Sequence, residues 1–134
     1  MKTKLNAILI FGLAAVALSL VAFTIPQDEW VVPEKYANMK NEYAGEDDDG
    51  IGEELYAQHC KSCHGKEGYG DGTKAKELDT EMREIPSEDV QSQSDGALYY
   101  KAIIGRDEMP SFEKKIRDDE DRWMVINYLR TLKE

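Results

Sequence analysis

Three residues near the middle of the chain combine types and spacing that suit a chemical role: Cys60, Cys63 and His64. The two cysteines are three positions apart and the histidine is four after the first, so on a helix all three side chains share one face. Two thiols and an imidazole on one face can bind a single flat cofactor. The pattern Cys-x-x-Cys-His is typical of covalent haem c, in which both cysteines form thioether bonds and the histidine binds the iron.

Other interpretations of the motif agree less well with the sequence. A thioredoxin-like redox pair belongs to a βαβ unit, and no such unit surrounds these cysteines. A structural zinc site needs four ligands, and the other histidine, His59, lies on the same helical turn as the motif. An ordinary buried cysteine pair would not account for His64 and the Gly65 that follows it. We therefore predict one haem c per chain, bound through Cys60 and Cys63 with His64 as an axial ligand.

Covalent haem c is normally attached outside the cytosol, and residues 1–26 are typical of an export segment. Two lysines precede an uncharged, largely apolar run at residues 5–25, which ends at Pro26. As a helix with a rise of about 1.5 Å per residue, this run is about 30 Å long, enough to span a bilayer. A cleaved signal peptide and an uncleaved transmembrane anchor both remain open. Either one places the folded part on the periplasmic side of the cytoplasmic membrane.

Residues 27–50 are expected to form an acidic linker. The segment ends in Glu46-Asp47-Asp48-Asp49-Gly50, where like charges repel one another and favour a solvated chain. Trp30 and Tyr36 leave open whether part of the segment packs on the folded domain. The domain itself is expected at residues 51–134, a length at which a hydrophobic core alone supplies little net stability.

The domain is predicted to be all-α, with helices at about 52–63, 74–78 and 97–104 and a last helix from Asp118 onward. Ser94 is the expected N-cap of the third helix. The last helix begins with four acidic residues, which the helix dipole favours there. Its apolar stripe consists of Val125, Ile126, Leu129 and Leu132. We expect this stripe to pack on the first helix, where Gly52 would let the two backbones cross closely.

The segment at residues 65–72 reads Gly-Lys-Glu-Gly-Tyr-Gly-Asp-Gly. Such a glycine content predicts a chain that turns closely around a neighbour, expected to be the haem edge on the histidine side. A phosphate-binding loop would need a Gly-Lys-Ser/Thr ending and a preceding strand, and the sequence has neither.

A six-coordinate haem iron needs a second axial ligand opposite His64, and Met109 is the best candidate. It lies in a predicted loop, and Pro110 restricts it to an extended conformation. His59 is fixed on the helix that carries the motif, on the wrong side of the ring. Met82 stays an alternative ligand, and a methionine that only fills the core is the alternative role for Met109.

From Gly52 to its end, the chain resembles the class I, monohaem c-type cytochromes of the bacterial periplasmic or membrane-anchored type. The resemblance rests on the haem motif, on Gly-Asp-Gly at residues 70–72, on Met109-Pro110 and on residues 123–132. It implies a small all-α cytochrome c fold of three to four helices around one covalent haem. The candidates for contacting the haem propionates are Tyr69, Arg83 and Arg106.

The function implied by the resemblance is the transfer of single electrons in a respiratory chain, by a monomer that is not itself an enzyme. With His64 and Met109 both bound, the iron has no open position for oxygen or substrate. The alternative is a haem c subunit of a periplasmic oxidoreductase complex, such as a dehydrogenase or a terminal oxidase. A gas sensor or peroxidase would require that Met109 is not a ligand.

Charge narrows the range of partners. The formal net charge of the chain is −10, which makes nucleic acid and anionic lipid poor partners and leaves redox proteins. A set of basic residues nonetheless surrounds Met109 in the sequence: Lys101, Arg106, Lys114, Lys115 and Arg117. They predict either a locally basic face for a partner or ordinary solvated side chains.

Overall fold

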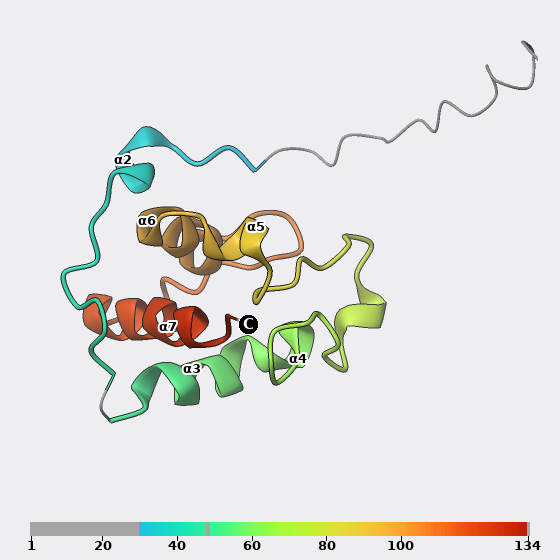
Figure 1. Ribbon diagram of the computed structural model, residues 1–134. Helices are drawn as coiled ribbons and strands as arrows, with labels where there is room; N and C mark the ends of the chain where they lie inside the picture. Colours follow the sequence, from blue (N-terminus) through green and yellow to red (C-terminus); the bar gives the residue numbers. More distant parts are fainter. Residues whose placement is uncertain (1–29, 48, 134) are drawn as a thin grey trace, which may run out of the picture. The chain divides into compact units, whose positions relative to one another are not determined.

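Figure 1 shows the computed structural model, which describes residues 30–47 and 49–133. The chain divides into two compact units, Met1–Val31 and Val32–Glu134, and every helix named below belongs to the second. No helix in the described ranges has both the length and the apolar character needed to cross a membrane. The predicted export or anchor segment, residues 1–26, lies outside the described residues.

The regular secondary structure of the described residues is helical, which confirms the predicted all-α fold. The α-helices are α2 (Glu34–Ala37), α3 (Ile51–His59), α4 (Lys61–His64), α5 (Glu88–Gln91), α6 (Asp95–Tyr99) and α7 (Asp119–Thr131). A 3-10 helix, η1, spans Ala75–Glu77, and a π-helix, η2, spans Tyr100–Ile104.

Two of the expected helices are each divided in two. The helix expected at residues 52–63 bends at Cys60, whose φ of −113° separates α3 from α4. The helix expected at 97–104 begins earlier, as α6, and continues as η2. Ser94 is its N-cap, as predicted, and accepts a hydrogen bond from the backbone N–H of Ala97 at 3.2 Å. The capping signal therefore located this helix, whereas its length and hydrogen-bond pattern differ from the prediction.

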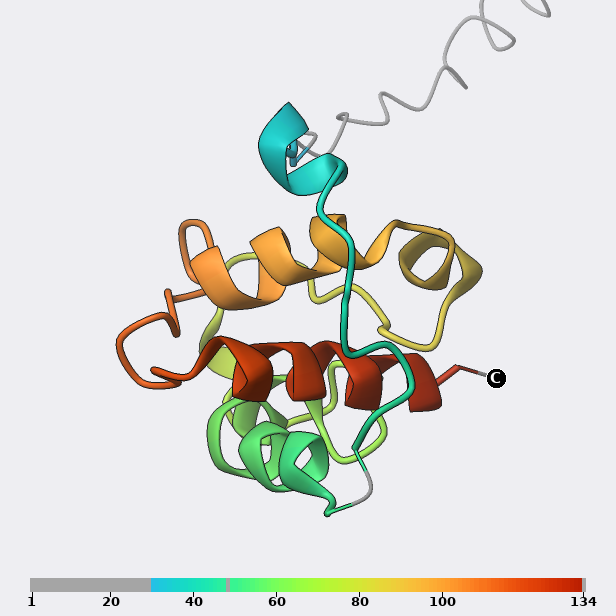
Figure 2. The same cartoon turned by 90° about the vertical axis from the view of Figure 1, so that its left-hand side faces the viewer.

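Helices α3 and α7 lie side by side in both views of the molecule (Figures 1 and 2). At their crossing, a Cβ atom added to Gly52 would lie 2.1 Å from the carbonyl oxygen of Met124. The prediction that this glycine lets the first and last helices cross is confirmed. Beside the crossing, the rings of Tyr56 and Tyr128 pack with their centroids 5.1 Å apart.

Helix α7 provides much of the hydrophobic core. The predicted stripe is confirmed, since Val125, Ile126 and Leu129 are buried and Leu132 is partly buried against them. Trp123 of the same helix also belongs to the core. The core takes in further buried residues from other segments: Tyr56, Ile85, Leu98, Tyr99, Ile103, Phe112 and Ile116.

The acidic start of α7 is a capping structure, as expected. Asp118 accepts a hydrogen bond from the backbone N–H of Glu120 at 2.9 Å. Asp119 accepts hydrogen bonds from the Tyr99 hydroxyl at 2.7 Å and from the Trp123 indole at 3.2 Å. Burial, followed by the hydrogen bond to Asp119, raises the pKa of Tyr99 to about 12, so its hydroxyl stays a donor at neutral pH.

Residues 32–47, which we call the strap, pack on the helices instead of forming the expected acidic linker. The ring of Tyr36 lies 6.5 Å from that of Tyr99 and 4.7 Å from that of Tyr100, between centroids. A Cβ atom added to Gly96 in α6 would lie 1.9 Å from the carbonyl oxygen of Tyr36. The strap and α6 are therefore in backbone contact, which requires a glycine.

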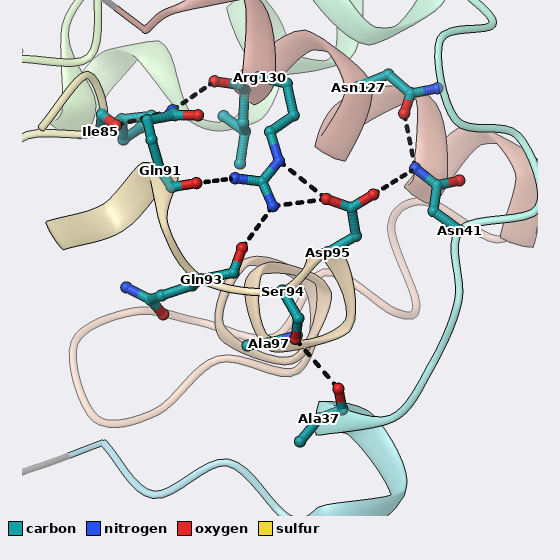
Figure 3. Close-up of polar contacts among 11 residues, drawn as sticks. Ala37, Asn41, Ile85, Gln91, Gln93, Ser94, Asp95, Ala97, Asn127 and Arg130 are labelled. Atoms are coloured by element: carbon teal, nitrogen blue, oxygen red, sulfur yellow. Dashed lines mark hydrogen bonds and ion pairs between the residues drawn. The ribbon is translucent and has the colours of Figure 1, made fainter. Parts of the chain in front are cut away.

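The polar contacts of the strap centre on Asn127, which is only 8% exposed. Its Nδ2 donates to the carbonyl oxygens of Tyr43 and Glu46, both at 2.6 Å, and its Oδ1 accepts from Asn41 at 2.7 Å. Asn41 also donates to Asp95 at 3.3 Å (Figure 3). Uncharged side chains therefore hold much of residues 32–47 on the helices, and Asp47 of the charge run adds contacts, since it accepts from the backbone N–H of Gly52 at 3.0 and 3.2 Å.

Arg130 extends the same network from α7 to α6 (Figure 3). Its guanidinium donates to the Asp95 carboxylate at 2.6 Å and to the carbonyl oxygens of Gln91 and Gln93 at 2.7 and 2.6 Å. Because the pair with Asp95 is only partly exposed, it is less screened by solvent than a surface ion pair.

Gly52→Ala should destabilise the protein, because the added Cβ atom meets the Met124 carbonyl at the helix crossing. We expect a loss of about 1–3 kcal/mol in the free energy of unfolding, even though alanine has the higher helix propensity. Guanidinium chloride unfolding of the haem-loaded protein measures this. Glu53→Ala, an exposed change on the same helix, should stay within about 0.5 kcal/mol of the wild type. Equal stability of Gly52→Ala and wild type would contradict the close crossing.

Asn127→Ala should release the strap, because it removes three hydrogen bonds and leaves two strap carbonyls without their donor. We expect the free energy of unfolding to fall by about 1–3 kcal/mol. Limited proteolysis should then cut within residues 32–47 faster than in the wild type. Asn38→Ala, an exposed change in the strap itself, is the matched control and should leave the cleavage rate unchanged.

Candidate haem site

The motif residues lie on one helical turn. Cys60 stands at the bend before α4, and Cys63 and His64 are the last two residues of α4. The backbone N–H groups of Cys63 and His64 both donate to the carbonyl oxygen of Cys60, at 3.1 and 2.9 Å. The bend therefore preserves the helical spacing of the motif, and all three side chains are half-buried.

The surroundings of Cys60 argue against a redox pair. Burial, followed by the nearby Cys63, raises the pKa of Cys60 to about 12. Catalytic disulfide exchange uses thiols with a lowered pKa, because the thiolate is the nucleophile. In the described part of the chain, no group of three or more His, Cys, Asp or Glu side chains could hold a metal ion.

His64 has a property that suits an iron ligand. Its Nδ1 atom is buried and has no hydrogen-bond partner. Burial also lowers the pKa of His64, so the imidazole is neutral and keeps a lone pair on one nitrogen. A buried polar atom without a partner is costly, and such atoms in native proteins need an explanation. A haem group beside the motif would give the imidazole a metal to bind, so these residues fit haem.

His59 is half-buried against Phe112, with ring centroids 5.7 Å apart. Burial, followed by the charge of Lys115, lowers its pKa. Phe112 comes three residues after Met109, and His59 comes directly before Cys60. This contact brings the neighbourhood of Met109 to the neighbourhood of the motif, two regions that are far apart in the sequence.

The glycine-rich segment at residues 65–72 turns closely around α4. The backbone N–H of Gly70 donates to the His64 carbonyl at 2.8 Å, and that of Gly72 donates to the Cys63 carbonyl at 3.1 Å. A Cβ atom added to Gly72 would lie 2.4 Å from the carbonyl oxygen of Ser62. At Gly72 the neighbour that demands a glycine is therefore the motif helix itself, whereas Gly68 faces Ile85 and Gly70 faces Met82. A contact of this loop with the haem edge stays a prediction.

Met109 closes a tight turn. The backbone N–H of Arg106 donates to the Met109 carbonyl at 2.8 Å, and the backbone N–H of Met109 donates to the Arg106 carbonyl at 2.9 Å. A Cβ atom added to Gly105 would lie 2.3 Å from the Met109 carbonyl oxygen. The Met109 side chain is half-buried and packs against the core.

Glu108 was not identified by the sequence analysis, because an acidic residue in a loop gives no specific signal. Its carboxylate accepts hydrogen bonds from the backbone N–H groups of Asp79 and Thr80, at 3.1 and 2.7 Å. Hydrogen bonding to the Thr80 side chain, and then to these two N–H groups, lowers the pKa of Glu108. The carboxylate is therefore ionised at neutral pH.

A pocket of about 420 Å³ lies beside the glycine-rich segment. Its lining consists of Tyr69, Gly70, Ala75, Lys76, Leu78, Asp79, Thr80, Glu81 and Met82. The predicted ligands Cys60, Cys63, His64 and Met109 do not belong to this lining. Met82 packs on the glycine-rich segment, since a Cβ atom added to Gly70 would lie 2.7 Å from the Met82 Cβ.

The other residues singled out from the sequence already have protein partners. Arg83 pairs with Asp89 at 2.5 Å, and Arg106 pairs with Asp107 at 3.2 Å. Their contact with haem propionates, like that of the 41% exposed Tyr69, stays a prediction. Of the basic residues around Met109, Lys101 donates to Gln93 at 2.6 Å. Lys114, Lys115 and Arg117 are exposed.

Comparisons with known proteins bear on the family of the chain. The family model described as cytochrome c oxidase, cbb3-type, subunit III, matches residues 47–129. A solved structure, the KustC0563 c-type cytochrome, is similar with a TM-score of 0.52 and 28% sequence identity, covering 62% of this chain and 98% of that chain. Among curated proteins, none matches significantly. The chain therefore belongs to the cbb3-type subunit III family and is a monohaem c-type cytochrome, a protein that carries electrons on haem.

Proposed function

We propose that this cytochrome is a one-electron carrier of a respiratory chain, with one haem c held through Cys60 and Cys63 and ligated by His64 and Met109. The observation that carries the proposal is the motif on one helical turn, with a buried imidazole nitrogen of His64 that lacks a partner. When bound, the haem supplies an iron that alternates between Fe(II) and Fe(III).

The protein residues have separate roles in this proposal. The thiols of Cys60 and Cys63 form the two thioether bonds, and His64 binds the iron through its neutral imidazole. Met109 is favoured as the second ligand over Met82. The His59–Phe112 contact brings the Met109 neighbourhood to the motif, whereas Met82 packs on the loop that follows His64. With both axial positions taken, the iron exchanges electrons without binding a substrate.

A second candidate function is that of a haem subunit in a periplasmic oxidoreductase complex. The observation that favours it is the family description, which names a subunit of a terminal oxidase. In either case we propose that the chain is exported and works on the periplasmic side, with residues 1–26 as an anchor or a signal peptide. Purification under mild detergent separates the two functions, because a subunit should co-purify with catalytic partners and a carrier should not.

Cys60→Ala combined with Cys63→Ala should abolish covalent attachment, because no thiol then remains to form a thioether bond. After a denaturing gel, staining for haem peroxidase activity should reveal the wild-type band and no band for the double variant. Ser62→Ala, an exposed change inside the motif, is the matched control and should keep the band. Haem retained by the double variant would rule out this mode of attachment.

Met109→Ala tests the axial ligand. If the Met109 sulfur binds the iron, the variant should lose the weak sulfur-to-iron absorption band of the ferric protein in the far red. Its reduction potential should fall because the soft ligand is gone, and carbon monoxide should bind the ferrous form readily. Absorption spectra in both redox states and a potentiometric titration measure all three.

Met82→Ala is the control for that experiment, since it removes the alternative methionine. It should alter stability slightly and leave the far-red band intact. If the wild type already binds carbon monoxide quickly and Met109→Ala changes nothing, the iron has an open position and the electron-carrier proposal is wrong.

A further inference from the structure

Glu108 links two parts of the site that lie far apart in the sequence. Its carboxylate oxygens each accept one backbone hydrogen bond, from Asp79 at 3.1 Å and from Thr80 at 2.7 Å. These donors precede Glu108 by 29 and 28 residues. One side chain thus joins the turn that contains Met109 to the segment that leads to Met82.

The segment that receives Glu108 has little regular structure of its own. It follows η1, and residues 78–84 contain no helix. Backbone N–H groups need acceptors, and a carboxylate is a strong one. Glu108 therefore provides Asp79 and Thr80 with hydrogen bonds that the local secondary structure does not, at the wall of the 420 Å³ pocket.

The turn that carries Glu108 directs its side chain away from the core. Asp107 has a φ of +52°, in the left-handed region that non-glycine residues seldom adopt. Arg106 and Met109 are joined on either side of it by their two backbone hydrogen bonds. The geometry of this turn therefore couples Glu108 to Met109: the hydrogen bonds of the Glu108 carboxylate tie the turn that ends at Met109 to residues 79 and 80, and their loss removes that tie.

We propose that Glu108 is a positioning residue for Met109. Its hydrogen bonds to Asp79 and Thr80 hold the turn in place and so keep the Met109 sulfur available as an axial ligand. This inference rests on the proposed function, because it requires Met109 to be that ligand. Glu108 does not touch the iron, and it acts through the backbone of the residue beside it. A merely structural role would change stability and leave the ligand bound.

The test uses Glu108→Ala in the haem-loaded, full-length protein, with two companions. Glu108→Gln keeps one acceptor oxygen and the shape of the side chain. Glu113→Ala removes another exposed carboxylate from the same region, one that does not reach Asp79 or Thr80. For Glu108→Ala we expect a weaker far-red band in the ferric protein. Carbon monoxide should bind the ferrous protein about tenfold faster, as the loss of charge-assisted hydrogen bonds implies.

The proposal is supported if the far-red band and the carbon monoxide rate of Glu108→Gln lie between those of Glu108→Ala and the wild type. Glu113→Ala should have the wild-type values of both. If Glu108→Ala keeps the wild-type band and carbon monoxide rate, the proposal is overturned, even where the variant unfolds at lower temperature. Met109→Ala is measured in parallel to separate the two hypotheses. If Met109→Ala loses the far-red band and Glu108→Ala keeps it, only the proposed role of Glu108 is wrong. If Met109→Ala has the wild-type band and carbon monoxide rate, both the ligand assignment and the role of Glu108 are wrong.

Discussion

The rest of the structure depends on the close approach of α3 and α7 at Gly52. The Met124 carbonyl oxygen of α7 occupies the space that a Cβ atom at position 52 would need, so only a glycine there permits this close crossing. That crossing fixes the far end of α3, where Cys60 begins the motif. Tyr56 strengthens the link, because its ring packs on Tyr128 of α7 and its hydroxyl donates to the carbonyl of Gly65 at 2.8 Å. The last helix thereby helps to position the haem motif.

In the stretch at residues 66–93, polar contacts largely take the place of a side-chain core. Ile85 is the buried aliphatic residue of the stretch at 66–93. The glycine-rich segment is held by backbone hydrogen bonds to α4, and the next segment is held by Glu108. A domain of this size has a small core to begin with. In a c-type cytochrome, the haem can provide the apolar surface that this half of the domain lacks.

Local signals in the sequence were sufficient for the all-α class, for the caps at Ser94 and Asp118, and for the glycine at the helix crossing. Each of these depends on residue types at fixed spacing. The strap and Glu108 could not be predicted, because a short polar side chain shows its partner only when residues distant in sequence meet. Asn127 illustrates the difficulty: one amide inside an apolar stripe holds a segment more than eighty residues earlier in the chain. The ligand role of Met109 stays a prediction for a related reason, since it depends on the cofactor.

The strap also bears on the choice between a free carrier and a subunit of a complex. A linker from residue 26 to residue 50 would extend at most about 80 Å, at about 3.4 Å per residue. Because the strap is already part of the folded unit from Val32 onward, the chain between residues 26 and 32 spans at most about 20 Å. If residues 1–26 anchor the protein, as proposed for one of its two forms, a tether of that length would raise the effective concentration of the haem domain toward a membrane-bound partner. An anchored form is therefore better suited to a fixed neighbour, as in an oxidase complex, than to long-range shuttling, whereas a cleaved form would be free of this constraint.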